Sequence, residues 1–372
     1  MNITSQVENK ETSLRTRCGY IPCESIKAFE KNLSDSGAVA LGKSLHFGVD
    51  LVCSGGINSL FKILWEYSLN HVGIASVRIF MYLKKRLDEI DSLIKIYPDE
   101  TLYSNQEFQL KVGEIILIVH DAPKSPKIVW PKVGAETHDS VWIKNVANTV
   151  DSEIVNRVWK REGDLMILRT VGNELCKCLA EHSLERALFW IKWLFEEEVK
   201  MKKENNKSTL TTINRGVGKS KQDVSLYIVV LFAEYYKELA RKQQIRMHEE
   251  FQSLLDIYKS NDPRYTSSFK RNLLGLIAQI LCEVPRWKIP AANPLIKDPV
   301  VLSRAVQQTP KFFTEILIYP SVVSEKLQKA LKNKGKTTEH VGKTKGNKIV
   351  SMEEQFAAFD AAMESYITGV NR

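Results

Sequence analysis

The chain has 372 residues, of which 44% are hydrophobic and 26% are charged, and its formal net charge is +9 at pH 7. This length is enough for one large or two medium domains, and the composition argues against global disorder. The 53 Lys and Arg residues are largely offset by 44 Asp and Glu residues, so the chain is not a polycation. The basic excess can attract phosphate backbones or anionic surfaces, and it is equally consistent with a mildly basic solvated surface.

Residues 1–21 are polar, lack the apolar core of a signal peptide and are predicted to be a disordered leader. The six cysteines include no C-x2-C pair, the usual spacing of structural zinc sites, so we expect reduced thiols in the cytoplasm or the nucleus. The apolar runs are far shorter than the roughly 20 residues of a membrane-spanning helix, so no membrane span is expected.

Residues 22–122 are predicted to form an N-terminal helical block. It begins with a helix over 24–33, followed by a small-residue loop over 34–44 and a helix over 57–70. An apolar stripe at helical spacing runs from 77 to 94 and predicts a further helix that ends at Pro98. Ser104 and Glu107 have the spacing of a capping box, which opens a helix ending near residue 120.

Residues 123–148 are rich in proline and are predicted to be an irregular connection to the main helical block, residues 149–331. A polar basic linker, residues 200–222, interrupts this block. Its helices are expected over 152–161, 164–181, 183–203, 223–240, up to 258, 269–284, 300–308, 310–319 and 323–332. The aromatic residues of the 183–203 helix extend beyond one stripe, so it either packs on more than one side or presents an aromatic surface to a partner. Packing is the favoured interpretation.

Residues 332–350 are predicted to be a flexible lysine-rich linker, and residues 351–369 an amphipathic helix that begins with the capping box of Ser351 and Glu354. Four apolar residues lie on one face of this helix: Phe356, Phe359, Met363 and Ile367. The helix either folds back on the body or docks in a groove of a protein partner. The long leash favours docking.

The two basic linkers concentrate positive charge where no core constrains it, so their side chains are candidate contacts for phosphate. No aromatic residue interleaves them, so base stacking is not indicated, and the alternative is that they are solvated spacers. The candidate phosphate contacts are Lys202, Lys203, Lys207, Arg215, Lys219, Lys221, Lys334, Lys336, Lys343, Lys345 and Lys348.

Two His-Asp dipeptides support a different hypothesis, a metal-dependent helical phosphohydrolase of the HD type. Adjacent histidine and aspartate side chains can bind one metal ion from a single helix end. The four residues are His120, Asp121, His138 and Asp139. His71 or His46 could supply an upstream ligand and Asp164 a distant one. His-Asp dipeptides also arise by chance, so a metal site is only the alternative interpretation.

The sequence GVGKS, residues 216–220, is similar to the end of a phosphate-binding P-loop. The first glycine of that motif would fall on Ile213, and a helix rather than a buried strand precedes the segment, so nucleotide binding is rejected. None of the G-x-S-x-G, H-E-x-x-H and G-x-G-x-x-G motifs is present. We therefore expect no cofactor and a chain that is not an enzyme.

The segments Ser183–Lys203 and Tyr265–Trp287 are separated by a lysine-rich gap and a long helix. This order resembles uncharacterised helical proteins of nucleocytoplasmic large DNA viruses. The resemblance covers about the middle third of the chain, and it implies a viral protein of the infected cytoplasm or the virion but no activity. The residues themselves predict an all-α scaffold or interaction protein: a bundle-like body with a flexible basic linker and a C-terminal helix, which binds a protein partner or nucleic acid.

Overall fold

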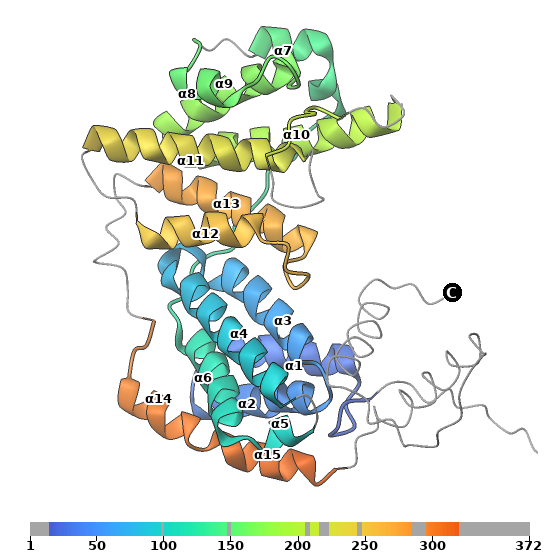
Figure 1. Cartoon of the computed structure of the whole chain (residues 1–372), viewed down its shortest axis with the longest axis vertical. Coiled ribbons are helices and arrows are strands. Elements are labelled where there is room, and N and C mark those ends of the chain that lie inside the picture. The colour runs from blue at the N-terminus through green and yellow to red at the C-terminus, as the bar shows by residue number, and fades with distance from the viewer. Residues whose placement is uncertain are drawn as a thin grey trace, which may run out of the picture. The chain divides into compact units, whose positions relative to one another are not determined.

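A computed structural model describes residues 15–97, 100–146, 150–204, 209–215, 223–243, 248–283 and 295–319. These residues form helices and connecting loops, with one isolated β-bridge between Asp164 and Thr211 and no longer strand within the described ranges (Figure 1). The predicted all-α fold class is confirmed. No described helix is both long enough and apolar enough to cross a membrane.

Contacts along the chain divide it into two compact units. The first unit is drawn from Met1–Leu64, Lys85–Asp121 and Ile296–Arg372, and the second from Trp65–Lys84 and Ala122–Leu295. The division falls inside two helices, α3 (Ile57–His71) and α4 (Arg78–Ile96), so each contributes residues to both units. It also differs from the predicted blocks, because the helices over 299–317 belong with the N-terminal helices rather than with the main block.

The first unit contains the early helices and the last two described ones. They are α1 (Pro22–Ser34), α2 (Ala38–Cys53), the first half of α3 (Ile57–His71), most of α4 (Arg78–Ile96), α5 (Thr101–Ser104), α6 (Gln106–Asp121), α14 (Pro299–Val306) and α15 (Thr309–Leu317). Their apolar faces meet in a core in which Phe29, Phe61 and Phe108 are fully buried. The helix predicted from the long apolar stripe is confirmed as α4.

Helix α2 occupies most of the segment that was predicted to be a small-residue loop, so that prediction is wrong. The helix packs against α1 and α6. Its Gly48 allows this close approach, since a Cβ there would lie 2.5 Å from Cδ1 of Ile116. Small residues are compatible with a helix when tertiary contacts bury it, and propensity alone does not reveal such contacts.

The predicted disordered leader is also wrong for its described part, residues 15–21. The side chain of Arg17 is buried, its backbone N–H donates to Oγ of Ser54 (2.8 Å), and the N–H of Cys18 donates to Oδ1 of Asp50 (2.9 Å). The backbone of this segment is therefore held by side chains at the end of α2. Residues 1–14 lie outside the described ranges.

The N-terminal cap of helix α6 lies one residue later than predicted, at Asn105. The side chain of Asn105, rather than that of Ser104, accepts the N–H of Phe108 (2.9 Å). Near the middle of α6, Gly113 lies against the first residue of α15, because a Cβ at Gly113 would lie 1.9 Å from Oγ1 of Thr309. This contact positions α15, whose Phe313 is buried edge-on against Phe108 at 6.1 Å between ring centroids.

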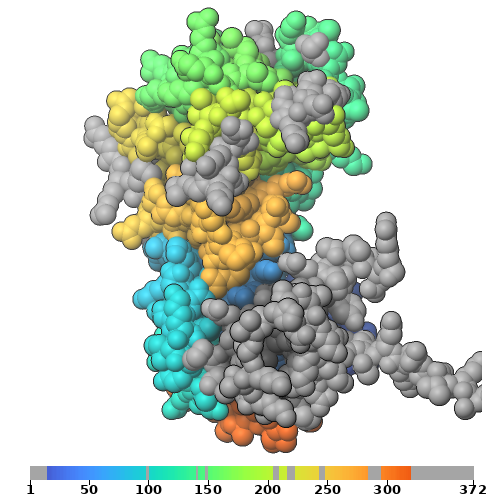
Figure 2. Space-filling model, turned by 45° about the vertical axis from the view of Figure 1, so that its right-hand side comes forward, coloured from blue at the N-terminus to red at the C-terminus, as the bar shows by residue number. Residues whose placement is uncertain are grey.

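The second unit contains the remaining elements. They are η1 (Gly73–Ala75), η2 (Ala135–His138), α7 (Ser140–Val146), α8 (Glu153–Val158), α9 (Met166–Ala180), α10 (Leu184–Glu204), α11 (Val224–Gln243), α12 (Glu249–Lys259) and α13 (Ser267–Glu283). The yellow-to-orange side chains of α12 and α13 lie packed together on the face shown in Figure 2. Trp65 is fully buried, with its ring edge-on to those of Tyr265 (5.2 Å) and Phe269 (5.7 Å).

The tryptophan side chains of helix α10 are packed inside the second unit. Trp190 and Trp193 are buried, and Nε1 of Trp193 donates to the carbonyl oxygen of Thr137 (3.1 Å). Trp142 of α7 lies against Trp190 at 5.9 Å. The interpretation that this helix packs on more than one side is confirmed, because residues 123–146 cover its second face. The prediction of an irregular connection is wrong for part of this segment, since it contains η2 and α7.

Candidate functional site

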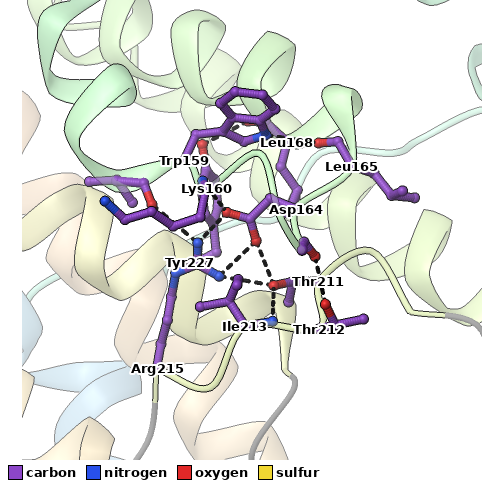
Figure 3. A network of polar contacts seen from close by, with 12 residues as sticks. Trp159, Lys160, Asp164, Leu165, Leu168, Thr211, Thr212, Ile213, Arg215 and Tyr227 are labelled. Carbon is purple, nitrogen blue, oxygen red and sulfur yellow. Dashed lines mark hydrogen bonds and ion pairs between the residues drawn. The ribbon is translucent and has the colours of Figure 1, made fainter.

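The predicted basic linker of the second unit is held at its centre by a buried ion pair (Figure 3). Arg215 donates to both carboxylate oxygens of Asp164, with 2.9 Å between Nη1 and Oδ1, while Nη2 contacts Oδ2. Asp164 also accepts the hydroxyl of Thr211 (2.6 Å) and the backbone N–H of Lys160 (2.8 Å). The side chains of Arg215 and Asp164 are only 7% and 0% exposed.

The rest of the Arg215 guanidinium is used as well. Nη2 donates to the carbonyl oxygen of Val158 (3.1 Å), and the guanidinium lies 5.2 Å from the ring centre of Tyr227. The Tyr227 hydroxyl in turn donates to the carbonyl oxygen of Leu168 (2.8 Å), and burial raises the pKa of this phenol. The prediction that Arg215 contacts phosphate is wrong, because its charge is buried and satisfied within the fold.

Residues 209–215 lie alongside the 159–165 loop, which extends the anchor to the backbone. Leu165 N–H donates to the carbonyl oxygen of Leu210 (3.1 Å), and Thr212 N–H donates to that of Gly163 (2.8 Å). The side chain of Leu210 is fully buried. Residues 200–204 belong to α10. The 200–222 segment is therefore not a free linker along its whole length. We call residues 209–215 the anchored strip.

The other predicted phosphate contacts divide into two groups. Lys202 has a half-exposed side chain that pairs with Oε1 of Glu198 (3.2 Å), and Lys203 is exposed. Burial raises the pKa of Glu198, and the nearby Lys202 opposes that rise. The second group lies outside the described residues, as does the predicted docking face. The phosphate contacts outside the described residues are Lys207, Lys219, Lys221, Lys334, Lys336, Lys343, Lys345 and Lys348. The residues of the docking face are Phe356, Phe359, Met363 and Ile367.

The first His-Asp pair lies at the end of α6. Oδ2 of Asp121 accepts the backbone N–H of Lys297 (2.7 Å), so this carboxylate holds the segment that leads into α14. His120 immediately precedes it and is half-buried. In the structure, Asp121 of this pair therefore joins the end of α6 to the segment before α14.

The second His-Asp pair lies at the end of η2. The His138 ring stacks on Trp193 (5.1 Å, 12°) and its Nδ1 lies 2.6 Å from Oε2 of Glu197. Its Nε2 is 3.6 Å from Oε2 of Glu196. Oδ1 of Asp139 accepts the N–H of Val141 (3.0 Å) at the start of α7. Asp139 thus points to the helix start rather than toward His138.

No group of three or more His, Cys, Asp or Glu side chains within the described ranges is arranged to hold a metal ion. Asp164, the predicted distant ligand, is fully committed to Arg215. Of the predicted upstream ligands, His71 lies against Tyr67 at 4.6 Å, and His46 Nε2 contacts the Tyr20 hydroxyl at 3.2 Å. Within the described part of the chain, no three of the predicted ligands are therefore brought into one group that could hold a metal ion.

All six cysteines are free thiols. Burial raises the pKa of Cys18 to about 12, and the neighbouring Asp50 carboxylate adds to the rise. Burial likewise raises the pKa of Cys178 to about 11 and that of Cys282 to about 12. These thiols stay protonated at neutral pH and are poor nucleophiles, as expected of cysteines that serve as small core residues.

The anchored strip is the feature of this site that the sequence does not predict. Its sequence signal is the pair of apolar residues Leu210 and Ile213 inside a mostly polar segment. Comparison of the chain with protein families, with curated proteins and with solved structures gave no significant match.

Proposed function

We propose that this chain is a non-enzymatic helical interaction protein that binds an anionic partner, with the phosphate backbone of nucleic acid as the favoured ligand. The observation that carries the proposal is the buried Arg215–Asp164 pair, which holds the anchored strip to the 159–165 loop. The strip gives the lysine-bearing stretches on either side fixed points of departure from the body.

The charge of these stretches supports an anionic partner. Residues 205–222 contain Lys207, Lys219 and Lys221 in addition to Arg215, and no acidic residue. Because Arg215 is consumed inside the fold, the three lysines carry the available positive charge. Cations on short stretches that begin and end at fixed points of the body lose less conformational entropy on binding than the same cations on a long free linker.

The C-terminal segment 351–369 remains a second proposed contact, for a protein partner. Its support is the sequence pattern alone, a face with Phe356, Phe359, Met363 and Ile367 behind a lysine-rich leash. Such a helix can dock in an apolar groove independently of the lysines. The two contacts are therefore separable by substitution.

Fluorescence anisotropy of a labelled single-stranded oligonucleotide tests the proposal with the full chain. The variant carries Lys207→Gln, Lys219→Gln and Lys221→Gln. Its matched control carries Lys85→Gln, Lys95→Gln and Lys237→Gln, three exposed helical lysines, so both variants lose the same charge. We expect the first variant to bind at least about tenfold more weakly at low salt, since each lost phosphate contact removes a favourable counterion-release term.

The control variant should bind within about twofold of the unaltered chain, because a uniform loss of net charge has only a small effect on a local contact. Equal weakening in both variants would show that only overall charge attracts the nucleic acid. Unchanged binding in the first variant would reject the 205–222 stretches as the contact.

A further inference from the structure

Helices α8, α9 and α11 of the second unit line a cleft of about 460 Å³. This volume lies within the range of small-molecule binding sites. Its lining includes side chains near the start of α8, along the second half of α9 and near the end of α11. No residue of the anchored strip lines the cleft, so the cleft is a separate candidate site.

The inner part of the cleft is apolar and uncharged. Ile154 and Cys176 are buried side chains, and Leu239 contributes an apolar side chain from α11. Burial raises the pKa of the Cys176 thiol to about 12, so this group stays neutral at physiological pH. Such a surface favours an apolar group over a hydrated one.

The polar side chains inside the cleft offer a hydrogen-bond donor more readily than an acceptor. The amide of Asn173 is used on both sides: Oδ1 accepts the N–H of Ser152 (3.0 Å) and Nδ2 donates to Asp151 (2.9 Å). The Tyr235 hydroxyl has no hydrogen-bond partner in the described part of the chain. Burial raises the pKa of Tyr235 to about 12, so its hydroxyl remains a donor.

The charged side chains of the cleft leave an excess of positive charge. Oε2 of Glu238 accepts Arg157 (3.3 Å) and Oε1 accepts Arg241 (2.6 Å), so the two arginines offset its negative charge. Lys242, 3.8 Å from Oε1, adds a positive charge beyond that balance. Lys177 is exposed and forms no ion pair with a described residue. Lys177 and Lys242 therefore present cations at the solvent side of the cleft.

We propose that this cleft binds a small amphipathic anion, a molecule whose apolar group enters between Ile154, Cys176 and Leu239 while its carboxylate or phosphate faces Lys177 and Lys242. The Tyr235 hydroxyl donates a hydrogen bond to an acceptor of the same ligand. The chemistry recognised is an apolar chain or ring that ends in one anionic group.

The test uses the full chain and a head-group series with one apolar group. Anilinonaphthalene sulfonate serves as the fluorescent probe, and octanoate, octyl phosphate, octanol and octylammonium compete for it. Octanoate and octyl phosphate should displace the probe, and their relative potency distinguishes a carboxylate ligand from a phosphate ligand. Octanol and octylammonium should be at least about tenfold weaker, because they lack the group that pairs with the lysines.

Two exposed substitutions locate the binding. Lys177→Gln should weaken octanoate about threefold, the effect of losing one exposed ion pair, and Ala180→Trp, which narrows the mouth, should weaken it at least about tenfold. Lys237→Gln on α11, outside the cleft lining, is the matched control and should change nothing. Equal displacement by octylammonium and octanoate would overturn the proposal. So would full octanoate binding to Ala180→Trp, or the lack of saturable octanoate binding in calorimetry of the unaltered chain.

Discussion

Arg215 and Asp164 lie 51 residues apart in the sequence, and their side chains form a bidentate ion pair that is almost completely buried. The pair is accompanied by hydrogen bonds from Thr211 and Lys160, so no charge or lone pair of the carboxylate depends on solvent alone. Such a pair contributes little net stability when compared with an apolar replacement, but breaking it on one side leaves an uncompensated buried charge.

Arg215→Met is therefore expected to lower the free energy of unfolding by about 3–5 kcal/mol, and Asp164→Asn combined with it should restore part of that loss. The matched control is Lys237→Met, which removes a cation from the exposed pair with Glu234 and should cost less than about 1 kcal/mol. Urea unfolding provides the measurement. Similar small losses in both variants would contradict the buried pair as the anchor.

Arg215→Met should also change the hydrogen exchange of one backbone amide in the anchored strip. The amide of Thr212 donates to Gly163 only while the anchored strip is in place. Its hydrogen exchange should therefore accelerate in Arg215→Met more than the exchange of amides within α12, which the strip does not contact through any of its hydrogen bonds. Uniform acceleration in both regions would indicate global destabilisation rather than release of the strip.

Gly113→Ala should displace α15 in the first unit. The new Cβ would lie 1.9 Å from Oγ1 of Thr309 and 2.7 Å from its Cβ, so the helix must shift and expose Phe313. We expect a loss of about 1–3 kcal/mol in the free energy of unfolding and faster hydrogen exchange over 309–317. Gly42→Ala in α2 is the control, since no atom lies within 4 Å of its added Cβ, and helix propensity predicts a gain of up to about 1 kcal/mol. Equal effects of the two substitutions would contradict the close contact.

Glu238 is expected to make the stability of the second unit depend on pH in the acid range. Its hydrogen bond with Arg241, aided by Arg157 and Lys242, lowers the pKa of the carboxyl to about 2. Because the folded-state pKa lies below the unfolded value of about 4.3, the stabilisation is present above about pH 5 and is lost as the pH falls toward 2.

The urea midpoint of Glu238→Gln should therefore lie below that of the unaltered chain at pH 6, and the two should converge as the pH is lowered. The comparison variant is Glu234→Gln, whose carboxylate has one exposed partner, Lys237. Its midpoint should differ less from that of the unaltered chain at pH 6. A constant difference for Glu238→Gln across the acid range would contradict the assignment.

The sequence was sufficient to predict the helices that carry a long apolar stripe. The stripe from Val77 to Ile94 corresponds to α4, and the aromatic surplus of 183–203 is explained by packing on two sides of α10. These predictions succeed because the spacing of apolar residues is a local property of the chain. Knowledge of the tertiary contacts is therefore not needed to predict these helices.

The features that were missed depend on partners distant in sequence. Helix α2 looked like a loop because its small residues matter only against α1 and α6, where Gly48 meets Ile116. Arg215 looked like a free cation because nothing near it in sequence indicates that Asp164 lies beside it. The His-Asp dipeptides illustrate the converse, since adjacency in sequence does not determine what surrounds each side chain: the His138 ring stacks on Trp193, and Asp139 accepts the N–H of Val141.

The proposed function is tested most directly by the salt dependence of nucleic-acid binding. The logarithm of the association constant for a single-stranded oligonucleotide is measured against the logarithm of salt concentration for the unaltered chain, for the Lys207, Lys219 and Lys221 triple variant and for the Lys85, Lys95 and Lys237 control. We expect the slope of the triple variant to be shallower by about two, since each lost phosphate contact removes about 0.7, while the control keeps the original slope. Equal slopes for all three chains, or the absence of salt-dependent binding, would contradict it.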